Sequence, residues 1–276
     1  MQRRGGGVRR RSVWIAKGGA IIGLLAFVLV VRLLFPVLPG SARQASLAVG
    51  LGLALIPAVL WLILFYAYEL QEPEPLTYVL EVGILAGILT AAIAIPVVRG
   101  LYDTGRWLSS SPTVTLLGSI CVVGAVQEFC KYLAVRYTVF ENEDFDEVAD
   151  GVAYGTAAGL GVATVLNLSF VLSAAGVDAG PAVVRIVVTA MAHGSIGGVI
   201  GYFLGQAKVH GRDAGILWGF LVAAVLNGLV TFFLGTVTRS GLAYHPLNGL
   251  ALAAAVAIVL MVVLFRLVHL AEPSTA

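Results

Sequence analysis

The segment 149–173 reads ADGVAYGTAAGLGVATVLNLSFVLS, and its length and composition decide the fold. It carries one charged side chain, Asp150, and it exceeds the roughly 20 mostly apolar residues that a membrane-spanning helix needs. Gly151, Gly155 and Gly159 recur every four residues, so they lie on one helix face, where another helix can approach closely. The segment therefore predicts a transmembrane helix in the interior of a tight bundle.

Similar apolar runs recur along the whole chain of 276 residues, of which 59% are apolar and 12% are charged. The runs are 13–35, 45–68, 76–98, 112–137, 149–173, 182–205, 213–237 and 246–269. They are longer than the roughly 10-residue alternating strands of a membrane β-barrel. A soluble enzyme, a nucleic-acid-binding protein and a disordered chain are excluded by this much apolar surface. We predict an all-α polytopic membrane bundle with about eight transmembrane helices.

The ends of the chain and the short loops predict the domain organisation and topology. Residues 1–12 form a basic tail with five arginines, and residues 13–276 form a single integral membrane domain. The first run could instead be a signal peptide cleaved near Gly40-Ser41-Ala42, but its length favours a retained helix. The excess of Lys and Arg on one side predicts a multi-pass protein of the cell membrane with cytoplasmic N- and C-termini.

Polar residues inside the apolar runs are costly in a bilayer and point to function. Glu128 and Lys131 are three residues apart, so they share one face of a helix. They either neutralise each other as a structural ion pair, or Glu128 is a catalytic carboxylate or metal ligand tuned by Lys131. His193 lies four residues before Gly197, on the same stripe as Gly201 and Gly205, and so faces the bundle interior.

Three polar residues in different runs are expected at a similar depth in the membrane. At about 1.5 Å per residue, Glu128, His193 and Asn227 fall in the middle third of an apolar core about 30 Å thick. Such a group could surround a cavity holding a water that Glu128 activates, or a divalent metal bound by Glu128 and His193. The sequence contains no HExxH, GxSxG, Walker or CxxC pattern. Cys121 and Cys130 lie nine residues apart on opposite sides of one helix and cannot form a disulfide.

Four segments occur in the same order as in a known family of membrane proteins. They are YAYELQEPEP at 66–75, QEFCK at 127–131, FDEVADGVAYGTAAGLG at 145–161, and HGSIGGVIGYFLG at 193–205. Over about residues 65–235 they resemble the PrsW family of intramembrane proteases, which cut membrane-anchored regulatory proteins. The resemblance implies that Glu128, His193, Lys131 and Asp150 form the catalytic set.

The chain also departs from the pattern of that family. Gln127 replaces the first glutamate of the EExxK motif, and Leu166 replaces a second glutamate. Asn227 and Thr231 stand where the family has a histidine and an aspartate. Two alternatives to a protease therefore remain: a catalytically silent relative that binds or scaffolds a larger membrane complex, and a transporter or lipid-binding protein that uses the same polar cavity.

Overall fold

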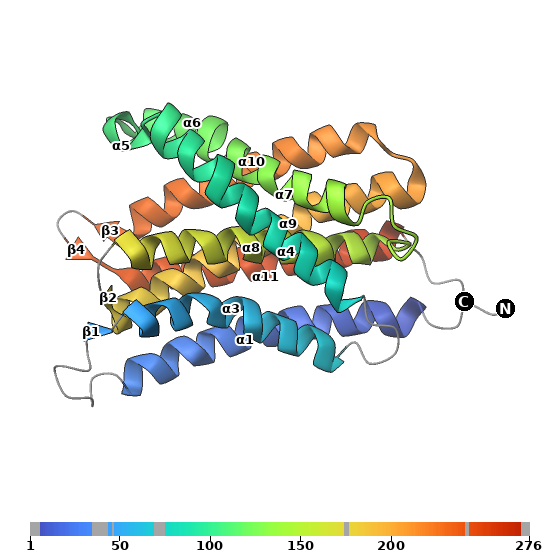
Figure 1. Ribbon diagram of the computed structural model, residues 1–276, viewed down its shortest axis with the longest axis horizontal. Helices are drawn as coiled ribbons and strands as arrows, with labels where there is room; N and C mark the ends of the chain where they lie inside the picture. Colours follow the sequence, from blue (N-terminus) through green and yellow to red (C-terminus); the bar gives the residue numbers. More distant parts are fainter. Residues whose placement is uncertain are drawn as a thin grey trace.

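A computed structural model describes residues 6–34, 44–45, 47–68, 75–173, 177–240 and 243–271, which form a bundle of helices (Figure 1). The long helices are α1 (Gly6–Leu34), α3 (Leu47–Tyr68), α8 (Val148–Ser173), α9 (Ala179–His210), α10 (Ala214–Thr238) and α11 (Pro246–Ala271). Two further spans are composite. In the first, α4 (Leu76–Leu89) continues into the π-helical segments η2 (Thr90–Ala94) and η3 (Pro96–Leu101). In the second, α6 (Pro112–Gly118) runs through the π-helical η4 (Ser119–Gly124) into α7 (Ala125–Thr138).

Short elements connect these spans at one end of the bundle. Helix α5 (Thr104–Trp107) lies between the two composite spans. Strand β1 (Gln44–Ala45) pairs antiparallel with β2 (Val177–Asp178), with Gln44 opposite Asp178. Strand β3 (Arg239–Ser240) pairs antiparallel with β4 (Ala243–Tyr244), with Arg239 opposite Tyr244. Each strand is two residues long, so the pairs only link the connections between helices and do not form a sheet layer.

The prediction of a polytopic helical bundle is confirmed, and each predicted apolar run coincides with a helical span. Six helices among the described residues are long and apolar enough to cross a membrane, beginning at Leu76, Pro112, Val148, Gly180, Ala214 and Pro246. The first two runs correspond to α1 and α3, whose apolar stretches in the described residues are Gly18–Leu33 and Ala48–Ile63. The proposed cleavage site at 40–42 and residues 69–74 of the first resembling segment lie outside the described residues.

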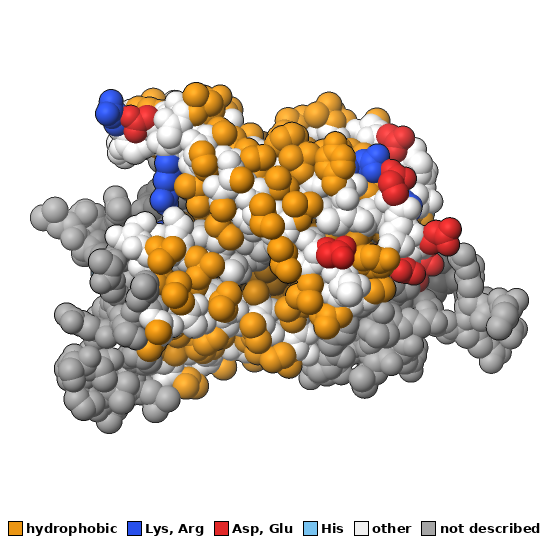
Figure 2. All heavy atoms as spheres, viewed as in Figure 1, with side chains coloured by type: hydrophobic (Ala, Val, Ile, Leu, Met, Phe, Trp, Pro, Cys, Tyr) orange, Lys and Arg blue, Asp and Glu red, His pale blue; other side chains and the backbone are white. Residues whose placement is uncertain are grey.

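Helices α8 and α9 form the centre of the bundle. In Figure 1, α1 and α3 lie on one side of α8, while α4 crosses it on another side and α10 lies beyond α7. Nearly every residue of the first half of α8 is buried. The outer helices instead expose large apolar side chains, among them Ile84, Ile88, Leu217 and Trp218. Figure 2 shows hydrophobic side chains covering most of the described surface on the viewed face, as expected for a surface in contact with lipid.

Backbone contact between glycines joins α8 to α9. A Cβ atom added to Gly151 would overlap the carbonyl oxygen of Gly201, and one added to Gly155 would overlap that of Gly197. A Cβ atom on Gly159 would overlap the carbonyl oxygen of His193. The predicted glycine stripes therefore face each other, and no side chain separates the two backbones.

The cysteine prediction is also confirmed. Cys121 in η4 is exposed, Cys130 in α7 is buried, and both are free thiols. Cys130 Sγ lies 3.6 Å from the carbonyl oxygen of Leu89, so it contributes a weak contact between α7 and α4.

Replacing a glycine in the α8–α9 contact tests this packing. Gly155→Ala should lower the free energy of unfolding by about 1–3 kcal/mol, since the new methyl group meets backbone that cannot rotate away. Gly52→Ala on α3 is the matched control, because a Cβ atom there has nothing within 4 Å. Thermal unfolding of the purified protein in detergent compares the two variants. Equal stability of both variants would contradict the proposed contact.

Candidate functional site

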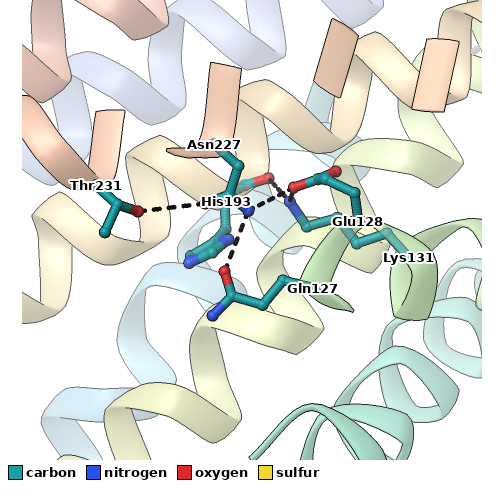
Figure 3. Close-up of polar contacts among 6 residues, drawn as sticks. All are labelled: Gln127, Glu128, Lys131, His193, Asn227 and Thr231. Atoms are coloured by element: carbon teal, nitrogen blue, oxygen red, sulfur yellow. Dashed lines mark hydrogen bonds and ion pairs between the residues drawn. The ribbon is translucent and has the colours of Figure 1, made fainter. Parts of the chain in front are cut away.

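Three helices bring polar side chains together inside the bundle (Figure 3). Helix α7 provides Gln127, Glu128 and Lys131, and α9 provides His193. Lys131 Nζ lies 2.5 Å from Glu128 Oε1, and both side chains are 0% exposed. The spacing of three residues on one helix thus produces the ion pair that the sequence predicted as one of two interpretations.

Asn227 of α10 links the carboxylate to its neighbours. Its Nδ2 atom donates to Glu128 Oε1 at 2.7 Å and to Gln127 Oε1 at 3.1 Å. The hydroxyl of Thr231 donates to Asn227 Oδ1 at 3.4 Å, one turn further along α10. The two residues that depart from the family pattern on α10 therefore take part in the same hydrogen-bonded cluster as Glu128.

Small residues bring α10 close enough for these contacts. A Cβ atom on Gly124 would lie 3.2 Å from the backbone nitrogen of Gly228 and would also meet the carbonyl oxygen of Ala224. Asn227 precedes Gly228, and Glu128 follows Gly124 by one turn, so this close approach sets their side chains next to each other. The predicted common depth of Glu128 and Asn227 agrees with their direct hydrogen bond.

Lys131 also joins α7 to α9. Its Nζ atom donates to the backbone carbonyl oxygen of His193 at 3.4 Å. The imidazole of His193 points toward the side of Gln127 and Thr231, away from the Glu128 carboxylate (Figure 3). The backbone of His193 therefore lies beside the ion pair, while its ring faces another region.

That region is a cavity of about 670 Å³. His193, Gln127, Asn227 and Thr231 form one part of its wall, and Leu166 lines it without filling it. The cavity is also lined by Thr104, Thr238 and Pro246, which lie near the end of the bundle where the two strand pairs are. Glu128 does not line the cavity, because the amides of Gln127 and Asn227 lie beside it.

Two buried atoms of the cluster, Glu128 Oε2 and His193 Nδ1, have no hydrogen-bond partner among the residues that the structure describes. Leaving a buried acceptor or donor unpaired costs about 1–3 kcal/mol, so such atoms call for an explanation. Both belong to residue types that accept or transfer protons and bind metals.

Asp150 is separate from this cluster. Its Oδ2 atom accepts hydrogen bonds from the backbone N–H groups of Asp146 and Glu147, at 3.2 and 2.8 Å. These contacts close the loop at the beginning of α8. Gly159, which faces His193, lies nine residues further on, about 13 Å along the helix axis. A catalytic role for Asp150 stays a prediction.

Comparison with known proteins identifies the family. The sequence model described as "PrsW family intramembrane metalloprotease" matches residues 74–268. The chain belongs to the PrsW family. Protease PrsW of Geobacillus kaustophilus is 29% identical over 188 residues, which cover 67% of this chain and 79% of that protein. Protease PrsW of Bacillus subtilis is 26% identical over 186 residues, covering 66% of this chain and 81% of that protein. No solved structure matches this chain.

The PrsW family description names a metalloprotease, and the donor set here does not fit a usual protein metal site. Catalytic zinc sites have three protein ligands from His, Cys, Asp or Glu. In the part of the chain that the structure describes, no three such residues form a group. Glu128 and His193 supply two candidate atoms, but the Lys131 ammonium already neutralises the Glu128 carboxylate. The remaining neighbours, Gln127 and Asn227, are amides.

Two residues of the cavity in this PrsW family member were not among the predicted site residues. Arg99 of η3 and Arg185 of α9 both line it. Arg185 lies inside a predicted apolar run, and a charged residue in such a run could have indicated a role in the site. Asn167, in contrast, donates to the carbonyl oxygen of Ile186 at 3.2 Å and serves helix packing.

A double-variant cycle tests the buried ion pair. Lys131→Met should destabilise the protein by about 3–5 kcal/mol, because it leaves a buried carboxylate without its cation. Glu128→Gln combined with Lys131→Met should recover most of that loss, since both charges are then absent. SDS titration in mixed micelles measures the free energies of unfolding. Arg106→Gln, which breaks the exposed pair with Asp103, should change little. Additive effects of the two buried substitutions would rule out the coupling.

Proposed function

We propose that this protein is an intramembrane peptidase that hydrolyses a peptide bond of a membrane-anchored protein. The observation that carries the proposal is the cavity whose wall includes the polar side chains of Gln127, His193 and Asn227 within the bundle, one hydrogen bond from Glu128. A peptide bond can be hydrolysed inside a membrane only where water and polar groups replace lipid. Family membership supports the same reaction class.

In the proposed reaction, Glu128 is the general base. Its Oε1 atom is held by Lys131 and Asn227, while Oε2 is unpaired and can accept a proton from water. The water oxygen attacks the carbonyl carbon of the peptide bond. His193 lines the cavity, and its unpaired ring nitrogen can accept that proton from Glu128 and pass it to the leaving nitrogen, which returns both side chains to their starting state. Lys131 keeps Glu128 ionised and oriented.

The reaction requires a change at Asn227. Its side-chain amide lies between the carboxylate and the cavity and donates to both Glu128 and Gln127. Rotation of this amide would break its hydrogen bond to Gln127, worth about 0.5–1.5 kcal/mol net, and its hydrogen bond to the Glu128 carboxylate, worth about 1.5–3 kcal/mol, and would bring Glu128 into contact with the cavity. A substrate polypeptide in the cavity can compensate by hydrogen bonding to the freed amides. We infer that the substrate itself completes the site.

The proposed topology determines the side of the membrane to which the cavity opens. Helix α1 begins and α11 ends at the same end of the bundle (Figure 1). With both termini in the cytoplasm, as the charge bias predicts, the cavity opens on the outer face of the membrane. The bond that is cut would then lie in the outer half of a substrate helix or just beyond it.

Cleavage of single-span reporter proteins in liposomes tests the peptidase. The unsubstituted protein should cut a reporter, and Glu128→Gln or His193→Ala should reduce the rate at least about a hundredfold, as expected for loss of a general base or acid. Glu81→Gln is the control, because Glu81 is an exposed carboxylate of α4 that does not line the cavity. Equal processing by all four proteins would refute the assignment.

A second candidate function is a catalytically silent subunit of a membrane complex. One observation favours it: Glu128 is fully buried, ion-paired and absent from the cavity wall. Gln127, which cannot take up a charge, replaces the family's first glutamate.

This alternative predicts no cleavage of any reporter by the unsubstituted protein, and stable co-purification of a second membrane protein. Binding of that partner should be unchanged in Glu128→Gln. Purification from native membranes always without a second chain would count against it, as would cleavage that depends on Glu128.

A further inference from the structure

The side-chain amide of Gln127 lies in the wall of the cavity, next to the proposed base. Gln127 and Val123 are one helical turn apart, and both line the cavity. The following residue, Glu128, is rotated by about 100° around the helix axis and contacts Lys131 instead. Neighbouring residues of one helix thus face the cavity and the ion pair. Gln127 is only 8% exposed, so its amide is held in an enclosed wall and not on an open surface.

The direction of this amide follows from the chemistry of its neighbours. An ionised carboxylate only accepts hydrogen bonds, so Asn227 must place its NH2 group beside Glu128. The same NH2 group lies 3.1 Å from Gln127, and because an NH2 group only donates, the Gln127 atom there must be the oxygen. The nitrogen of Gln127 is therefore on the opposite side of the amide. Figure 3 shows it pointing away from Asn227 and Glu128.

The two N–H groups of this nitrogen are free to bind a ligand. Among the residues that the structure describes, Gln127 accepts a hydrogen bond from Asn227, and its Nε2 atom donates to none. The imidazole of His193 points toward the same side (Figure 3). A fixed N–H donor in an enclosed site stabilises negative charge that develops on a reacting oxygen, more strongly than it would in water. Gln127 thus has the position and the chemistry of such a donor.

We propose that Gln127 Nε2 donates to the carbonyl oxygen of the bond that is cut and stabilises the oxyanion of the tetrahedral intermediate, which rests on the proposed function. As the water oxygen bonds to the carbonyl carbon, Glu128 takes up one water proton and the π electrons of the C=O bond move to its oxygen. That oxygen becomes negative and binds the N–H of Gln127. When the carbon–nitrogen bond breaks, those electrons form C=O again. The leaving nitrogen keeps the bonding pair and receives the proton through His193, which gives a carboxylic acid and an amine.

The substrate can hold the Gln127 amide in place after Asn227 has moved. Each residue of a polypeptide carries a backbone N–H and a C=O. An N–H of the substrate can donate to Gln127 Oε1 in place of Asn227, while the reacting carbonyl oxygen accepts from Nε2. A carboxylate at position 127 has no hydrogen to donate and would repel an oxyanion. The glutamine at this position therefore supplies a donor that the family's first glutamate would not.

Cleavage kinetics of the full chain in liposomes, with a single-span reporter protein, test this role. Gln127→Met has a side chain of similar length without the donor, and it should lower kcat about a hundredfold with little change in KM. Gln127→Glu keeps an oxygen for Asn227 and also removes the donor, so it should lower kcat at least as much. Gln206→Ala is the control and should leave kcat unchanged. Gln206 is a buried amide that does not line the cavity, about 20 Å along α9 from His193.

A binding measurement makes the test independent of turnover. The probes are single-span peptides in which one backbone amide, at successive positions, is replaced by a phosphinate, whose charged tetrahedral oxygens resemble the intermediate. At one position, the phosphinate should bind about a hundredfold tighter than a matched peptide with a neutral, uncleavable ketomethylene group. Gln127→Met and Gln127→Glu should each remove most of this difference, and Gln206→Ala should keep it. Thermal unfolding identifies any variant that does not fold, and the remaining Gln127 variant then decides.

The outcomes separate this role from the proposed function. A phosphinate preference that depends on Gln127, without any cleavage by the unsubstituted protein, would support the donor and refute the peptidase. Cleavage with unchanged kcat in Gln127→Met, or faster cleavage by Gln127→Glu, would overturn the role of Gln127 and leave the peptidase intact. Neither cleavage nor a preference for the phosphinate would overturn both.

Discussion

The close contact between the backbones of α8 and α9 is the constraint on which the site depends. Gly159 has no side chain where the carbonyl oxygen of His193 approaches it, and the same oxygen accepts a hydrogen bond from Lys131. A larger residue at position 159 would displace His193 and Lys131 together. Glycines that cannot take part in chemistry therefore set the positions of residues that can. The bilayer makes this packing necessary, because helices in lipid gain little from burying apolar side chains and rely on close contact instead.

Much of the fold could be predicted from periodicity and length. Runs of about 20 apolar residues determine the spans, and glycines four residues apart identify α8 and α9 as central. The ion pair of Glu128 and Lys131 follows from spacing on a single helix. Each of these features depends on residues within one segment. That is why boundaries such as 149–173 and 213–237 agree with α8 and α10 to within one residue.

The rest depends on how different helices are arranged around each other, which no single segment encodes. Asn227 could be assigned a depth from the sequence, but not its contacts with both Glu128 and Gln127. Arg99 and Arg185 lie 86 positions apart and share a cavity only after α9 and η3 pack on α8. Asp150 belongs to the segment 145–161, which resembles the PrsW family. Its carboxylate accepts two backbone hydrogen bonds that close the loop at the beginning of α8. Membership of the motif does not predict these two hydrogen bonds, because they depend on how the loop before α8 folds back on the helix.

In the proposed peptidase, the cluster would keep a carboxylate in the middle of a membrane protein and still allow it to react. The ion pair of Glu128 with Lys131 carries no net charge, and the attraction between the two groups offsets part of the cost of burying them. Asn227 then satisfies the same carboxylate oxygen and separates it from the cavity. The two interactions differ in strength: breaking the buried ion pair costs about 3–5 kcal/mol, whereas the amide contacts are worth about 0.5–3 kcal/mol each. A polypeptide that competes for the amides of Gln127 and Asn227 can therefore expose Glu128 while Lys131 stays in place. In this proposal, stability and reactivity rest on different partners of one carboxylate, and the weaker partner is the one that borders the cavity.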